Sequence, residues 1–161
     1  MFRILFILFS TQLFSQGSVE IKGFTNINSF KCISKKVHLQ KHNAPSDLPI
    51  KEIIVKINDF ECDSKKMTQE FKEMMNADKN PDIKITVNSH NSTSNKQINT
   101  VSDVNMNGKT KRYNMPVVLN NNHYQITQWF NIHHFNLKPP RILGGLVKIK
   151  DEVQVTVNIN K

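Results

Sequence analysis

The chain has 161 residues, of which 38% are apolar and 22% are charged, and its formal net charge is +9 at pH 7. This composition is typical of one packed domain and argues against an intrinsically disordered chain. The basic residues are scattered and do not alternate with aromatic residues, so we interpret the charge as solvated surface and expect no nucleic-acid partner.

The first fifteen residues have the pattern of a secretory signal peptide. Arg3 precedes an apolar run over residues 4–9, and the small residue Ser15 follows at the spacing that a signal peptidase reads. The run is shorter than the roughly 20 apolar residues of a membrane span, so we expect cleavage before Gln16 and no stable membrane insertion. The expected mature protein, residues 16–161, would be periplasmic or secreted.

Alternating apolar residues mark the first expected strands. Residues 18–33 alternate in two phases, and the slip to the phase of Phe30 suggests one strand with a bulge. Residues 34–49 are polar. A second clear strand is expected over residues 53–57.

A short helix is expected next. Ser64 is a typical N-cap residue, and apolar residues recur after it at the spacing of one helix face. The helix should stop before Pro81. The residues of this face are Met67, Phe71, Met74 and Met75.

The strongest local signal of the chain lies at Asn107-Gly108, between two β-rich runs. This dipeptide is typical of the two-residue turn of a β-hairpin. Before it, an alternating strand is expected over residues 83–87, followed by a polar turn over residues 88–97.

The C-terminal part predicts further strands. After a polar turn at residues 120–122, one strand is expected over residues 124–137, where Pro139 follows. Residues 146–160 alternate again and predict a closing hairpin that turns at residues 151–152. About eight short strands and one helix indicate an all-β sandwich or barrel, and the pattern alone does not choose between them.

Three parts of the chain together resemble the YceI-like family, also called polyisoprenoid-binding-like proteins. They are the Gly-Phe-Thr-Asn start of residues 23–30, the strand, helix and Asn-Pro-Asp-Ile start of a strand over residues 60–83, and the hairpin of residues 104–111, with Phe135 and residues 147–153 after it. The resemblance implies an extended lipocalin-like antiparallel β-barrel with one helix at its side. In some members the interior encloses a long isoprenoid chain.

An apolar ligand, such as an isoprenoid or fatty acyl chain, is therefore the expected partner. Large apolar side chains are the plausible lining of its pocket: Met67, Phe71, Met74, Met75, Met106, Trp129, Phe130, Phe135 and Leu143. The alternative is an envelope scaffold or partner-binding protein with a filled barrel, in which these residues are ordinary core.

Where the family usually has an Arg-Asp pair, this chain has Lys66-Met67, which leaves the identity of the ligand's polar head group open. A homodimer also stays open.

The sequence contains none of the common catalytic or metal-binding motifs, such as Gly-x-Ser-x-Gly, His-Glu-x-x-His or Cys-x-x-Cys. His38 and His42 have ligand spacing only in a helix, yet they lie in a polar segment near Pro45. His133 and His134 are adjacent and would point to opposite faces of a strand. We expect no enzyme, no metal and no cofactor.

Cys32 and Cys62 are expected to form a disulfide. Export would place both in an oxidising compartment, and each follows a Phe by two residues at the end of an expected strand. The alternative is two buried free thiols. Closing the chain between them would contribute roughly 3.5 kcal/mol of stability.

Overall fold

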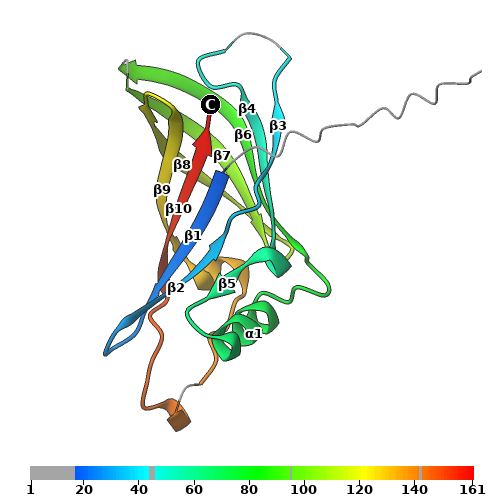
Figure 1. Ribbon diagram of the computed structural model, residues 1–161, viewed down its shortest axis with the longest axis vertical. Helices are drawn as coiled ribbons and strands as arrows, with labels where there is room; N and C mark the ends of the chain where they lie inside the picture. Colours follow the sequence, from blue (N-terminus) through cyan, green and yellow to red (C-terminus); the bar gives the residue numbers. More distant parts are fainter. Residues whose placement is uncertain (1–16, 44–45, 95, 142) are drawn as a thin grey trace, which may run out of the picture.

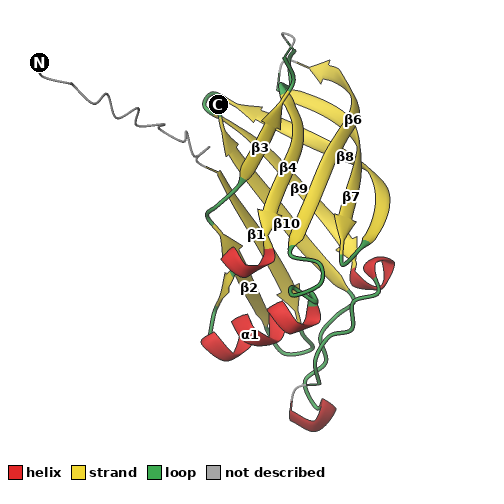
Figure 2. Cartoon of the chain, turned by 90° about the vertical axis from the view of Figure 1, so that its right-hand side faces the viewer, coloured by secondary structure: helices red, strands yellow, loops and turns green. Residues whose placement is uncertain are grey.

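The computed structural model describes residues 17–161 except 44–45, 95 and 142. The predicted signal peptide and its cleavage point therefore lie outside the described residues. The described chain forms one strongly curved antiparallel sheet with a helix packed at one end (Figures 1 and 2).

Ten strands and one α-helix are described. In chain order they are β1 (Gly17–Phe24), β2 (Ser29–Ser34), β3 (His38–Lys41), β4 (Ile50–Lys56), β5 (Glu61–Cys62), α1 (Lys65–Met74), β6 (Asp82–Ser94), β7 (Gln97–Met106), β8 (Lys109–Asn120), β9 (His123–Asn131) and β10 (Glu152–Asn160). Three short 3-10 helices are η1 (Ile57–Asp59), η2 (Ile132–Phe135) and η3 (Leu143–Gly145). The strands lie side by side in the order β3-β4-β6-β7-β8-β9-β10-β1-β2-β5. The expected lipocalin-like all-β fold is confirmed, with more strands than expected.

The core lies on the concave face of this sheet. In β10, for example, Val155, Val157 and Ile159 are buried, while the residues between them face outward. The same alternation runs through the neighbouring strands, because successive side chains of a strand point to opposite faces. The inward side chains form one apolar cluster inside the barrel.

The hairpin at Asn107-Gly108 is confirmed. Both residues have positive φ, 49° and 70°, which suits the tight turn between β7 and β8. The side-chain amide of Asn107 also donates a hydrogen bond to the carbonyl oxygen of Phe135, at 3.0 Å. The turn is thereby tied to η2, which follows β9.

The structure corrects the expectation for residues 18–33. A turn at residues 25–28 divides them into two strands, and no bulge is needed to explain the change of phase. Ile21 faces Cys32 across the pair and Gly23 faces Phe30, so Phe30 and Cys32 point to the same inner side as Ile21. Thr25 closes the turn, since its hydroxyl donates to the carbonyl oxygen of Asn28 at 3.0 Å.

Two further boundaries differ from the sequence prediction. Most of the expected turn at residues 88–97 is strand, because β6 continues to Ser94 and pairs with β7. The expected strand over residues 124–137 ends at Asn131, whose side chain accepts a hydrogen bond from the backbone of His133 at 2.9 Å and starts η2.

The predicted closing hairpin was wrong. Residues 152–160 form β10, which pairs with β9 and β1, but Val147 and Ile149 do not pair with it. Ile149 instead makes an isolated bridge to Thr25. The short strand β3 was not predicted, whereas β5 ends at Cys62, where the end of a strand was expected. They form the two edges of the sheet and show little alternation.

Only glycine fits at position 23, because the aromatic ring of Phe30 covers it. A Cβ atom at this position would collide with the aromatic ring of Phe30, which lies directly across from it. We expect Gly23→Ala to lower the free energy of unfolding by about 1–3 kcal/mol, the usual cost of an overpacked site. Guanidinium denaturation would measure this.

The matched control for Gly23→Ala is the same substitution in a Phe30→Ala background, where the ring is gone. Because residues in direct contact do not contribute additively, the cost of the added methyl group should largely vanish there. Equal costs in both backgrounds would show that the collision with Phe30 is not the cause.

Candidate functional site

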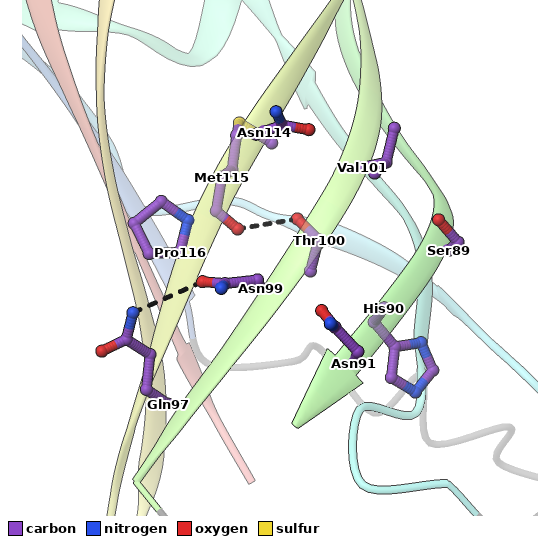
Figure 3. Close-up of a pocket in the computed structure, with 10 residues that line it drawn as sticks. All are labelled: Ser89, His90, Asn91, Gln97, Asn99, Thr100, Val101, Asn114, Met115 and Pro116. Carbon is purple, nitrogen blue, oxygen red and sulfur yellow. Dashed lines mark hydrogen bonds between the residues drawn. The ribbon is translucent and has the colours of Figure 1, made fainter. Parts of the chain in front are cut away.

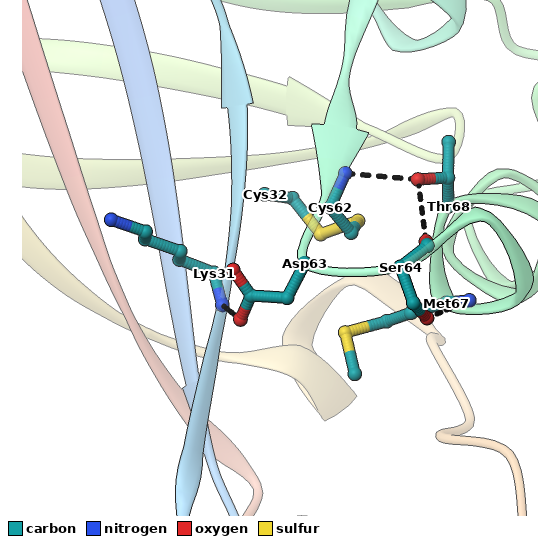
Figure 4. The surroundings of a disulfide bond; sticks show 7 residues. All are labelled: Lys31, Cys32, Cys62, Asp63, Ser64, Met67 and Thr68. Carbon is teal, nitrogen blue, oxygen red and sulfur yellow. Dashed lines mark hydrogen bonds between the residues drawn. A yellow bond between two sulfur atoms is a disulfide. The ribbon is translucent and has the colours of Figure 1, made fainter.

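Helix α1 closes one end of the barrel and is held there covalently. Cys32 of β2 and Cys62 of β5 form a disulfide, so the predicted pairing is confirmed (Figure 4). Beside it, the backbone of Lys31 donates to the Asp63 carboxylate at 3.0 Å, and the Asp63 backbone donates to the carbonyl oxygen of Lys31 at 3.2 Å. These bonds fix the chain immediately before α1.

The first turn of α1 is capped as the sequence predicts. The Ser64 hydroxyl accepts a hydrogen bond from the backbone of Met67 at 3.2 Å, which satisfies one free N–H of the helix start (Figure 4). Thr68 links the helix back to the disulfide, because its hydroxyl accepts from the backbone of Cys62 and donates to the carbonyl oxygen of Ser64, both at 2.9 Å. One face of α1 is thereby directed at the end of the barrel.

A small apolar cavity of about 60 Å³ lies under this face of the helix. The barrel, the helix and the segment after β9 all contribute to its lining, and Glu70 is the one charged residue among them. The lining residues are Ile21, Phe30, Cys32, Met67, Glu70, Phe71, Met74, Ile132, Pro140, Ile149 and Val153. Sites that enclose a drug-sized ligand measure roughly 300–1,000 Å³. The cavity as it stands is therefore the start of a pocket and cannot enclose a long chain without movement of its walls.

The structure divides the nine residues that we expected to line a pocket. Met67, Phe71 and Met74 line the cavity from α1. Four others are buried in the apolar core and are not among the lining residues: Met75, Met106, Phe130 and Phe135. The side chain of Leu143 lies outside the described part of the structure.

Trp129 lies on the outer face of the barrel, contrary to the expectation that it lines a pocket. It is 47% exposed and stacks on Phe24 with ring centroids 5.4 Å apart. The physical reason is the alternation of β9, where Phe130 occupies the inward position and its neighbour must point out.

Other lining residues were missed at the level of sequence. Phe30 and Cys32 were placed out of phase with Ile21, because the turn between β1 and β2 was not recognised. Pro140 and Ile149 come from the long connection between η2 and β10. No periodic pattern marks Pro140, and the alternation at Ile149 was assigned to a closing hairpin that the structure does not form. Ile21 and Val153 could have been predicted to face inward from the alternation of apolar residues in their strands.

A larger hollow lies on the outside of the barrel over β6, β7 and β8 (Figure 3). Its volume is about 570 Å³, and it is open. Polar side chains such as Asn91, Asn99 and Asn114 line it together with the apolar Val101, Met115 and Pro116. The Thr100 hydroxyl donates to the carbonyl oxygen of Met115 at 2.9 Å within the sheet below. Its lining offers both hydrogen bonds and apolar contact, and the hollow is open to solvent.

The titratable groups whose pKa departs from its usual value lie away from the apolar cavity. On the outer face of β7 and β8, the Arg112 guanidinium donates two hydrogen bonds to the Asp103 carboxylate, at 2.7 and 2.9 Å, and the pKa of Asp103 falls to about 2. Burial raises the pKa of Tyr113, whose hydroxyl lies 3.0 Å from Nδ1 of His134. Neither group touches a residue of the cavity's helix.

Within the described ranges, no three His, Cys, Asp or Glu side chains are grouped closely enough to hold a metal ion. The adjacent histidines His133 and His134 have different partners and do not form one site. His133 lies 3.0 Å from Asp151, whereas His134 contacts Tyr113. Of the helices in the described chain, none reaches the length and apolar character needed to cross a bilayer.

Solved structures with the same fold come from several bacteria. BcnA of Burkholderia cenocepacia has a TM-score of 0.74 at 15% identity, over 90% of this chain and 96% of that chain. A polyisoprenoid binding domain from Saccharophagus degradans has a TM-score of 0.71 at 8% identity, over 91% and 94%. The YceI protein of Campylobacter jejuni has a TM-score of 0.68 at 11% identity, over 81% and 82%. At these identities the likeness shows the fold alone.

At the level of sequence, no curated protein matches the chain. The model of the YceI-like domain, by contrast, matches residues 10–161, which is nearly the whole chain. This match agrees with the ten-stranded curved sheet, with the single helix α1 at its end and with the hairpin at Asn107-Gly108. The chain belongs to the YceI-like family.

Proposed function

We propose that this protein binds an apolar chain, such as an isoprenoid or a fatty acyl group, at the end of the barrel covered by α1, and that it is not an enzyme. The observation that carries the proposal is the apolar cavity between α1 and the inner face of β1, β2 and β10. The fold neighbour described as a polyisoprenoid binding domain supports the same class of ligand. The disulfide and the predicted signal peptide support an exported protein, periplasmic or secreted.

The ligand enters by displacing flexible side chains. Met67 and Met74 are partly exposed and line the cavity from α1, and methionine adapts readily to apolar surfaces of irregular shape. Phe71, which is 7% exposed, packs behind them against Phe60. Movement of the two methionines enlarges the cavity, while the disulfide keeps the start of the helix in place.

Glu70 selects the head group. Glu70 is one of the lining residues, and its carboxylate lies 3.9 Å from the Lys66 amine, a long and exposed ion pair that is largely screened. A negative charge on a lining residue disfavours ligands with a carboxylate or phosphate close to the chain. An uncharged isoprenoid alcohol is therefore the better probe.

The test is equilibrium dialysis of radiolabelled farnesol against the purified protein. We expect saturable uptake of about one molecule per protein, since each buried CH₂ contributes about 0.8 kcal/mol before ordering costs. Met74→Trp fills the cavity and should weaken binding at least roughly tenfold. The matched control is Val118→Trp, which adds an indole at an exposed position of β8 and should bind farnesol as the unsubstituted protein does.

The small size of the cavity favours one alternative, an envelope scaffold with a filled barrel that acts through a protein partner. Dialysis separates the two functions. Absence of saturable farnesol uptake, together with a purified protein whose organic extract contains no lipid, would contradict the carrier and leave the scaffold.

A further inference from the structure

Two of the most exposed large apolar side chains of the described chain lie at the same end of the barrel as the cavity. Leu146 is 79% exposed and Ile27 is 70% exposed. Ile27 is in the turn between β1 and β2, and Leu146 follows η3 in the connection between η2 and β10. Figures 1 and 2 show both connections at the lower end of the molecule, next to α1, and the second one projects furthest.

Hydrogen bonds hold these two apolar tips, Ile27 and Leu146, in one arrangement. The side-chain amide of Asn26 donates to the carbonyl oxygen of Leu146 at 3.2 Å and accepts from the backbone of Lys148 at 3.0 Å. The backbone of Asn26 donates to the carbonyl oxygen of Lys148 at 3.1 Å. The tips are therefore built next to each other, although the residues are far apart in the sequence.

The projecting connection is also strongly basic. Residues 136–150 include four cations, Lys138, Arg141, Lys148 and Lys150, and no acidic residue. All four side chains are exposed. Among the residues that the structure describes, none of the four forms an ion pair with a carboxylate. Their charge is thus free to meet a negative surface.

We propose that the apolar tips and these four cations dock the protein on the surface of an anionic lipid bilayer. Shallow insertion of exposed aliphatic side chains, combined with Lys and Arg beside anionic head groups, is how peripheral proteins bind membranes. The inference rests on the proposed function, because docking in this orientation places Pro140 and Ile149 of the cavity at the bilayer, where an apolar chain is taken up or delivered.

The shape of this surface favours a membrane over a protein partner. The tips project from loops, while a stable protein interface buries roughly 800 Å² on each partner across a broader complementary patch. The surface residue Trp129, on β9 close to the same end, adds an aromatic side chain of the kind that is enriched at the membrane interface. The experiment also has to distinguish a membrane from a second copy of this chain as the partner of this surface.

The experiment is sedimentation of the protein with vesicles of phosphatidylcholine and phosphatidylglycerol at 7:3, and with vesicles of phosphatidylcholine alone. All variants are purified with the same N-terminus, checked by intact mass. We expect binding to the anionic vesicles that falls with added salt, because salt screens exposed charges. A blue shift of the emission of Trp129, the one tryptophan of the chain, should accompany binding.

Two pairs of substitutions test the two components. Ile27→Ser with Leu146→Ser should weaken vesicle binding roughly tenfold or more, from the loss of two inserted aliphatic groups. Lys148→Gln with Lys150→Gln should weaken it roughly 25-fold, at about fivefold for each cation. The matched controls lie near the other end of the barrel: Val118→Ser for the apolar pair, and Lys51→Gln with Lys96→Gln for the charged pair. Both controls should bind as the unsubstituted protein does.

Several results would overturn the docking proposal. These are equal binding to both kinds of vesicle, equal effects of the test and control substitutions, or no vesicle binding by a protein that still takes up farnesol in dialysis. A dimer that Ile27→Ser with Leu146→Ser converts to a monomer, without any effect on vesicles, would assign the surface to a second copy. Vesicle binding without farnesol uptake would instead contradict the proposed function and leave the docking in place.

Discussion

Phe135→Ala is expected to lower the free energy of unfolding by about 3–5 kcal/mol, the range for truncation of a buried aromatic residue. Phe135 is fully buried in η2 and packs against two other rings, with centroid distances of 6.1 Å to Phe130 and 6.4 Å to Tyr113. Its backbone carbonyl also receives the Asn107 side chain. The surrounding strands cannot move into the space that the ring leaves, so most of the lost packing should appear as a lower free energy of unfolding. Guanidinium denaturation followed by circular dichroism would measure it.

The control for this prediction is Phe24→Ala, the same truncation on the outside of the barrel. Phe24 is partly exposed and contacts Trp129, so its loss should cost roughly 1 kcal/mol or less. A small effect at Phe135 would mean that the end of the barrel is loosely packed. That result would also return Phe135 to the residues that could contact a ligand.

Removal of the disulfide by Cys32→Ala with Cys62→Ala is expected to cost roughly 3.5 kcal/mol. The bridge closes a loop between residues 30 positions apart, and its loss lets the unfolded chain explore many more conformations. It also frees the two-residue strand β5, which pairs with β2 only at Ile33 and Cys32. Denaturation of the variant should show a lower midpoint.

Reduction of the unsubstituted protein is the matched comparison for the alanine pair. Treatment with dithiothreitol should lower the stability by a similar amount, since both changes open the same loop. Thiol titration of the denatured, unreduced protein should find no free thiol. Two free thiols, or a cost below about 1 kcal/mol for the variant, would contradict a stabilising bridge.

Where the local chemistry of a segment decides its structure, the sequence was a sufficient guide. Asn107-Gly108 suits a tight turn whatever surrounds it, and the Ser64 side chain caps α1 through residues of its own helix. The cysteine pairing followed from the expected compartment and the expected strands. These features depend on neighbours in the sequence, or on covalent chemistry, more than on distant packing.

The predictions failed where contacts between residues far apart in the sequence determine the local structure. Val147 and Ile149 alternate like a strand, but the backbone of their neighbours Lys148 and Lys150 bonds to Asn26 and Phe24 at the β1–β2 turn, away from β10. Residues 88–94 look like a polar turn, yet pairing with β7 keeps them extended. The outward position of Trp129 could have been predicted, because Tyr124 and Ile126 share the phase of Phe130 along β9 and leave Trp129 on the other face.

The pairing of β1 with β10 has a consequence for how the chain folds. Gly17 faces Ile159, so this contact joins the two ends of the described chain, while the β6–β7, β7–β8 and β8–β9 pairs form between neighbours in the sequence. Contacts of large sequence separation close late, because the loop entropy is lost before they form. A ribosome or a secretion pore that has released only the first 150 residues therefore leaves β1 and β9 each with an unpaired edge. The last strand completes the sheet, and folding of the barrel has to wait for the end of the chain.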